Sequence, residues 1–192
     1  SRPLDFLISE NPLTDSALSV LGLLLGGNGS AVGLGGPSLE GLLSSGTVVD
    51  GHIADAMVYR VDANGKKVGG YVFTDANGNY SGLAAGDAST KIVVQALSNY
   101  VDPLTNITHN SYDKDLSSTY GSKVAFTSAL TLYAPGNATV VNPITTLIQS
   151  IKDQSPGLSV DDASKLVANG LGLPQGISYL SFDPLSSAAS VS

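Results

Sequence analysis

The sequence predicts an α+β fold, a small antiparallel β-sandwich flanked by N- and C-terminal helices. Three observations lead to this fold class. Runs of β-branched and aromatic residues in the middle of the chain are separated by Asn-Gly turns. Glycine is abundant, with 22 residues, while aromatic residues make up only 6% and tryptophan is absent, a composition typical of a chain with many turns. An Asn-Pro pair, which favours a helix start, occurs near each end, at Asn11 and Asn142.

The chain divides into three parts, and its 192 residues suit one domain with an appendage. Residues 1–46 are predicted to form a helical and glycine-rich appendage that packs on the core, with a helix that begins at Asn11 and ends before Gly26. Residues 47–174 are predicted to form the β-sandwich, with a long loop at 98–123 and two closing helices. Residues 175–192 are predicted to be a tail or linker.

The sandwich is organised around two copies of Asp-Ala-Asn-Gly, at residues 62–65 and 75–78. Asn-Gly between extended runs favours a type I′ hairpin turn, which needs positive φ at both central residues. We therefore predict a meander with strands at 53–61, at 68–74 and from Tyr80 onward. The oxygen donors of both turns are expected at one end of this sheet.

Two further strands and two helices complete the predicted domain. Residues 91–97 and 124–133 have the composition and alternation of strands. Asn142 and Pro143 then begin a helix with apolar residues at i, i+3, i+4 and i+7. Ser159 caps a second helix, which Gly170 is expected to end.

Charge and composition exclude several classes of function. The net charge is −7 and the 9 Lys and Arg residues are scattered, so the chain lacks a nucleic-acid footprint. No apolar run reaches membrane-spanning length, so direct membrane contact is not expected. The absence of cysteine excludes disulfides, zinc fingers and thiol chemistry.

An enzyme is not expected either. His52 and His109 invite that interpretation, but no Gly-x-Ser-x-Gly elbow accompanies them. Glu10 and Glu40 are the sole glutamates, and no tryptophan platform exists for sugars, so paired-carboxylate glycosidase chemistry lacks support.

The acidic residues indicate calcium as a cofactor. Aspartate far outnumbers glutamate, and its short side chain favours turns and compact oxygen cages for Ca²⁺. In the long loop, Asp102, Asp113 and Asp115 are candidate ligands, the last two on one side of an extended segment; a solvated loop face is the alternative. Asp62 and Asp75 are further candidates, for which plain turn formation is the alternative.

The same loop carries the candidate ligand-binding residues. Tyr100, Tyr112 and Tyr120 could form the wall of a groove for an extended peptide, or one or two of them could anchor the loop to the sandwich. Thr105 and Asn110 could pair with a peptide backbone, and Asp102 could reach the ligand through a metal. A loop of this length inside a compact domain is usually functional or disordered.

Four stretches, taken in order, carry a family likeness. They are Val-Asp-Gly-His-Ile-Ala-Asp-Ala-Met-Val at 49–58, Asp-Ala-Asn-Gly at 62–65, Thr-Asp-Ala-Asn-Gly-Asn-Tyr at 74–80 and Val-Asn-Pro-Ile-Thr-Thr-Leu-Ile at 141–148. Together they resemble a carboxypeptidase-regulatory-like β-sandwich module of large bacterial adhesins, over residues 48–170.

More particularly, the chain is similar to the peptide-binding domain of repeats-in-toxin (RTX) adhesins. The resemblance implies a calcium-dependent module, monomeric within a larger fibre that is secreted by a type I route to the bacterial surface. It implies capture of short peptides, or of a surface protein, on a host or neighbouring cell, with calcium engaging a free C-terminal carboxylate.

The common module has a short connection where this chain inserts residues up to Lys123. We therefore predict that the insertion makes this domain a ligand-binding module. The alternatives are a spacer rigidified by calcium and a calcium-dependent lectin-like domain.

Overall fold

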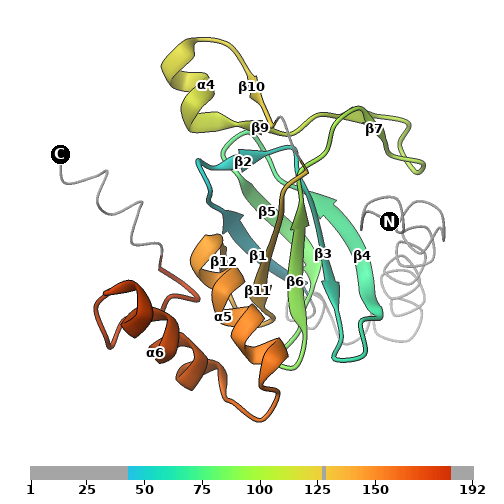
Figure 1. Ribbon diagram of the computed structural model, residues 1–192. Coiled ribbons are helices and arrows are strands. Elements are labelled where there is room, and N and C mark those ends of the chain that lie inside the picture. Colours follow the sequence, from blue (N-terminus) through green and yellow to red (C-terminus); the bar gives the residue numbers. More distant parts are fainter. Residues whose placement is uncertain (1–42, 127–128, 183–192) are drawn as a thin grey trace, which may run out of the picture.

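A computed structural model describes residues 43–126 and 129–182 of the chain. Two β-sheets face each other, short strands and one helix project at one end, and two helices follow at the C-terminal side (Figure 1). The predicted α+β class is thereby confirmed, while the predicted helix after Asn11 and the glycine-rich stretch lie outside the described residues. No helix within these two ranges is long and apolar enough to cross a membrane.

The sandwich consists of a four-stranded and a three-stranded sheet. The larger has the order β11-β6-β3-β4 and is antiparallel throughout. The smaller has the order β12-β1-β5, and its β12–β1 pair is parallel, unlike the antiparallel sheet predicted. The strands are β1 (Leu43–Val48), β3 (Met57–Val61), β4 (Lys67–Phe73), β5 (Asn79–Ala84), β6 (Lys91–Gln95), β11 (Thr131–Pro135) and β12 (Val140–Val141).

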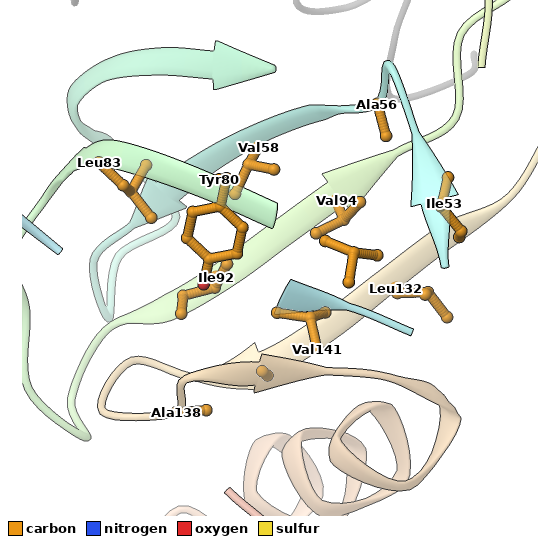
Figure 2. Close-up of a cluster of buried hydrophobic side chains, with 12 residues drawn as sticks. Ile53, Ala56, Val58, Tyr80, Leu83, Ile92, Val94, Leu132, Ala138 and Val141 are labelled. Carbon is orange, nitrogen blue, oxygen red and sulfur yellow. The ribbon is translucent and has the colours of Figure 1, made fainter. Parts of the chain in front are cut away.

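The main hydrophobic core lies between the two sheets (Figure 2). Alternate residues of a strand point to the same face, so β6 directs Ile92 and Val94 into the core, where both are 1% exposed. The smaller sheet contributes Val48, Leu83 and Val141 to the same core. Burial of these side chains is the dominant stabilising contribution to the sandwich.

A buried arginine joins the two sheets at one end of this core. Arg60 of β3 is 1% exposed, and its guanidinium donates to the carbonyl of Ala84 (2.7 Å), the carbonyl of Gly136 (2.8 Å) and the hydroxyl of Thr90 (2.7 Å). A Cβ at Gly136 would overlap the backbone carbonyl oxygen of Asp87 and would stand 2.8 Å from the guanidinium nitrogen, so this position requires glycine. Burial lowers the pKa of Arg60.

The two Asp-Ala-Asn-Gly segments form turns, but the meander predicted from them is wrong in three respects. The turns lie at opposite ends of β4, so their oxygen donors do not gather at one end of a sheet. The second turn crosses between sheets, because β5 pairs with β1. Among the turn residues, Gly65 (φ 80°) and Gly78 (φ 81°) have positive φ while both asparagines do not, which excludes type I′.

Two predicted strands are each divided in the structure. Residues 53–61 contain β2 (Ile53–Ala54) and β3, which belong to different sheets, with Asp55 between them at a φ of 55°. Residues 124–133 contain β10 (Val124–Ala125) and the start of β11, again in different sheets. At both places the chain passes between the sandwich and the elements that project from it.

The two C-terminal helices confirm the sequence prediction. Asn142 caps α5 (Pro143–Gln154) with a complete capping box, and Ser159 caps α6 (Val160–Leu171), which ends at Gly172 and not at Gly170. The hydroxyl of Thr146 accepts from the backbone N–H of Tyr133 (3.0 Å), and that of Thr145 donates to the Tyr133 carbonyl (2.8 Å). These bonds satisfy the outer edge of β11, which explains the Thr-Thr pair physically.

The chain after α6 stays in contact with the domain. Tyr179 is 2% exposed in the small core that α5 and α6 form. The carbonyl of Leu180 accepts from the N–H groups of Thr139 (2.7 Å) and Val140 (3.1 Å). The packed domain therefore continues to at least residue 180, and it includes Leu43 to Gly46 of β1, inside the predicted appendage.

Candidate ligand-binding site

Residues 98–125, here called the excursion, project from one end of the sandwich, at the top of Figure 1. They are a series of short elements: β7 (Tyr100–Val101), β8 (Thr108–His109), β9 (Tyr112–Asp113), α4 (Lys114–Tyr120) and β10. β7 pairs with β8, while β9 pairs with β10 and with β2. The predicted irregular loop is therefore an ordered structure built from pieces too short to show periodicity.

Asp55 joins the excursion to the sandwich. Its Oδ1 accepts from His109 Nδ1 at 2.6 Å, and its Oδ2 accepts from the backbone N–H of Asn110 at 2.8 Å. The carbonyl of Asp55 accepts from the Ser111 hydroxyl at 2.7 Å. The His109 ring stacks on Phe73, with centroids 3.7 Å apart and planes 7° from parallel. One residue with an unusual backbone conformation thus holds three successive residues of the excursion.

Asp102 is a second carboxylate with a structural role, and it lies inside the β7–β8 hairpin. It is 3% exposed, and its carboxylate accepts from the Tyr71 hydroxyl, the N–H of Leu104 (3.1 Å) and the hydroxyl of Thr105 (3.0 Å). Burial raises the pKa of Tyr71, and the bond to Asp102 raises it further. Burial, with a smaller contribution from Asp102, raises the pKa of Tyr100 to about 12.

Asp113 is extended as predicted, since it ends β9, but Asp115 lies in the first turn of α4 and not in an extended segment. Asp113 is the N-cap residue, and its Oδ1 accepts from the Leu116 N–H at 2.8 Å. Asp115 in the first turn accepts from His52 Nδ1 at 2.8 Å. The pKa of Asp50 is raised by burial and by the nearby carboxylate of Asp113.

The predicted calcium ligands do not assemble into a cage. Asp102 lies in the β7–β8 hairpin, whereas Asp113 and Asp115 lie at the start of α4, and each carboxylate already accepts hydrogen bonds from the protein. Asp62 and Asp75 each accept from two backbone N–H groups of their own turn. Across residues 43–126 and 129–182, no group of three or more His, Cys, Asp or Glu side chains could hold a metal ion.

The remaining candidate residues differ in exposure. Tyr100 is 5% exposed and anchors the excursion, whereas Tyr120 is 72% exposed and Tyr112 is half-buried under the Lys123 ammonium, 4.7 Å from its ring centroid. Thr105 is bonded to Asp102. The Asn110 side chain accepts from the Asn99 N–H at 2.8 Å. Of the five predicted ligand contacts, Tyr112 and Tyr120 are therefore the most available.

The excursion also exposes apolar side chains that sequence reasoning missed. Five of the ten large hydrophobic residues exposed in the described part belong to it. Three occur together on the β7–β8 hairpin, here called the apolar tip: Val101 (49% exposed), Leu104 (49%) and Ile107 (56%). The sequence does contain a signal for this hairpin, because Asp102 and Asn106 are turn-forming residue types on either side of Leu104. In the structure the N–H of Asn106 bonds to the carbonyl of Asp102.

Unusual backbone conformation is concentrated in the same region. In the described ranges, the non-glycine residues with positive φ are His52, Asp55, Asn99 and Asn106, at 51° to 59°. Two lie in the excursion and two in the segment that bonds to it. Such conformations have a free-energy cost and often occur at functional sites, where surrounding contacts maintain them.

Neither a model of a known protein family, nor a curated protein, nor a solved structure gives a significant match to this chain. The function is therefore inferred from the geometry of the excursion.

Proposed function

We propose that the domain is an extracellular adhesin module, without enzymatic activity, that binds a peptide segment on the surface of another cell through the excursion. The observation that carries the proposal is the apolar tip. Three exposed apolar side chains fall within residues 101–107 of one projecting hairpin, and apolar exposure gathered in one place is a mark of interaction sites. Functional residues are also concentrated on loops that a rigid scaffold positions.

The contacts beneath the tip favour binding with little ordering cost. Asp102 holds the turn from inside with three acceptor contacts, and Asp55 holds the base of the hairpin through His109 and Asn110. A binding element that already has its bound shape loses less conformational entropy on association. The excursion therefore suits capture of a flexible peptide.

Calcium dependence stays a prediction, and the proposed contact with the peptide does not rely on it. The aspartates expected to bind the ion serve as hydrogen-bond acceptors within the protein, and the described residues provide no assembled donor set. The surface location and type I secretion likewise rest on the resemblance of the motifs alone.

The proposal can be tested with a phage-displayed library of random peptides panned on the immobilised domain. We expect enriched peptides to bind the wild type and to lose at least tenfold in affinity for the double variant Val101→Ser/Ile107→Ser. The matched control is Leu166→Ser on α6, because Leu166 is 53% exposed and lies outside the excursion. The proposal would be contradicted if the library yields no binding peptide, or if its peptides bind the Val101→Ser/Ile107→Ser and Leu166→Ser variants equally well.

A further inference from the structure

A second surface of the excursion differs in chemistry from the apolar tip. An open depression of about 390 Å³ lies between α4 and the second Asp-Ala-Asn-Gly turn. We call it the lysine depression; the residues that define its chemistry are Asn77, Tyr112, Lys114, Ser117, Ser122 and Lys123. Segments distant in the sequence thus form one concave surface beside the half-buried Tyr112.

The charge of this surface is opposite to that of the chain. The protein has a net charge of −7, yet two of its 9 Lys and Arg residues line the depression. Among the described residues that line it, none is acidic. The nearest acids of α4 are already engaged, Asp113 as the helix cap and Asp115 with His52.

The two ammonium groups of the depression, those of Lys114 and Lys123, have no carboxylate partner among the described residues. Lys123 lies over the ring of Tyr112, 4.7 Å from its centroid, which restrains the ammonium beside the depression. Charge-assisted hydrogen bonds from such groups are stronger than neutral ones.

The surrounding polar groups suit a peptide. The exposed Asn77 amide offers both a donor and an acceptor to a main chain. The Ser117 hydroxyl is already used, because it donates to the Asp113 carbonyl and accepts from the Val124 N–H. These bonds fix the floor of the depression, so that ligand contacts fall to the lysines, Asn77 and the Tyr112 ring.

We infer that the lysine depression binds side-chain carboxylates of an acidic peptide segment, directly through Lys114 and Lys123 and without a metal ion. The inference rests on the proposed function, which supplies the peptide, and it names the class of peptide. The apolar tip and the lysine depression then recognise different parts of one ligand, an apolar part and an acidic part.

The test uses three synthetic peptides titrated by calorimetry in EDTA at low salt. The first is a hexapeptide of alternating Asp and Gly with both ends capped, the second its Asn-Gly counterpart, and the third the Asn-Gly peptide with a free C-terminus. We expect only the capped acidic peptide to bind, and to bind at least tenfold more weakly to the double variant Lys114→Gln/Lys123→Gln. The control Lys66→Gln/Lys165→Gln removes the same charge from exposed lysines elsewhere and should change affinity less than twofold.

Three results would overturn the inference: no binding of the acidic peptide to the wild type, equal binding to both double variants, or binding that needs only the free C-terminus. The proposed function fails separately, through Val101→Ser/Ile107→Ser and the library peptides. Library peptides that depend on the tip but not on the lysines would leave the adhesin proposal intact and remove the acidic-ligand inference.

Discussion

The sandwich and the excursion of this domain are stabilised in different ways. The sandwich has strands of up to seven residues and a continuous apolar core between its sheets. The excursion has strands of two residues, and carboxylates that accept several hydrogen bonds each maintain its shape. Global stability and the shape of the excursion therefore depend on separate sets of residues.

The largest expected effect is on the sandwich. Leu83→Ala removes a side chain that is 1% exposed between the sheets, and a substitution of this kind costs about 3 kcal/mol in the free energy of unfolding. Urea unfolding followed by circular dichroism measures it. Because Leu83 lies outside the excursion, the affinity of the folded fraction for library peptides should stay unchanged. A loss of affinity in parallel with the loss of stability would contradict the view that the two properties depend on separate residues.

Asp55→Ala should affect mainly the excursion. It leaves the buried His109 without the acceptor of its Nδ1 and removes the acceptor of the exposed Asn110 N–H; an unsatisfied buried group costs about 2 kcal/mol. We expect limited proteolysis to cleave within residues 98–111 at least tenfold faster. Asp62→Ala is the control, since Asp62 accepts from two backbone N–H groups of an exposed turn; equal cleavage in both variants would contradict the role of Asp55.

Asp102→Ala should have a smaller effect, confined to the tip. The substitution removes the acceptor for Tyr71, Leu104 and Thr105, while the base of the hairpin keeps its contacts to Asp55. We expect library peptides to bind severalfold more weakly, because about 1 kcal/mol of local ordering is lost. Asp75→Ala is the control, because Asp75 accepts hydrogen bonds in a turn outside the excursion. A larger loss of peptide affinity in Asp75→Ala than in Asp102→Ala would contradict binding at the apolar tip.

The smallest effect concerns pH and the outer face of the large sheet. Burial lowers the pKa of Lys67 to about 7, although the Tyr59 ring, 4.2 Å from its ammonium, favours the charged form. The unfolded chain keeps this proton up to a pH near 10.5, so it binds more protons than the folded state within that window. Unfolding free energy should therefore rise between pH 7 and about 9, and Lys67→Met should reduce that rise; identical slopes would show that Lys67 is not the cause.

The sequence predicted the elements that depend on local chemistry. Asn142 and Ser159 begin their helices because each side chain caps backbone N–H groups within the next turn. Gly65 and Gly78 mark real turns, since each has the positive φ that glycine tolerates. The same rules would have found α4, with Asp113 as its cap and Gly121 (φ 76°) after its last residue.

What the sequence could not predict are contacts between distant segments. Nothing local signals that Asp55 bonds to His109, because 54 residues separate them. The division of 53–61 into two sheets occurs at the same residue, because Asp55 leaves the extended conformation between β2 and β3. Calcium binding stays a prediction, because it depends on the same kind of information, the arrangement of carboxylates in space; in the described structure Asp102, Asp113 and Asp115 act as hydrogen-bond acceptors within the protein.

The most direct test of the account is hydrogen exchange of the excursion amides in EDTA. The N–H groups of Asp102, Asn106 and Ser111 bond to carbonyls within the described structure, so we expect them to be protected at least a hundredfold without calcium, and equally when calcium is added. Exchange at the rate of an unfolded chain in EDTA, with protection only after addition of calcium, would contradict the claim that the protein's own side chains hold the excursion in shape.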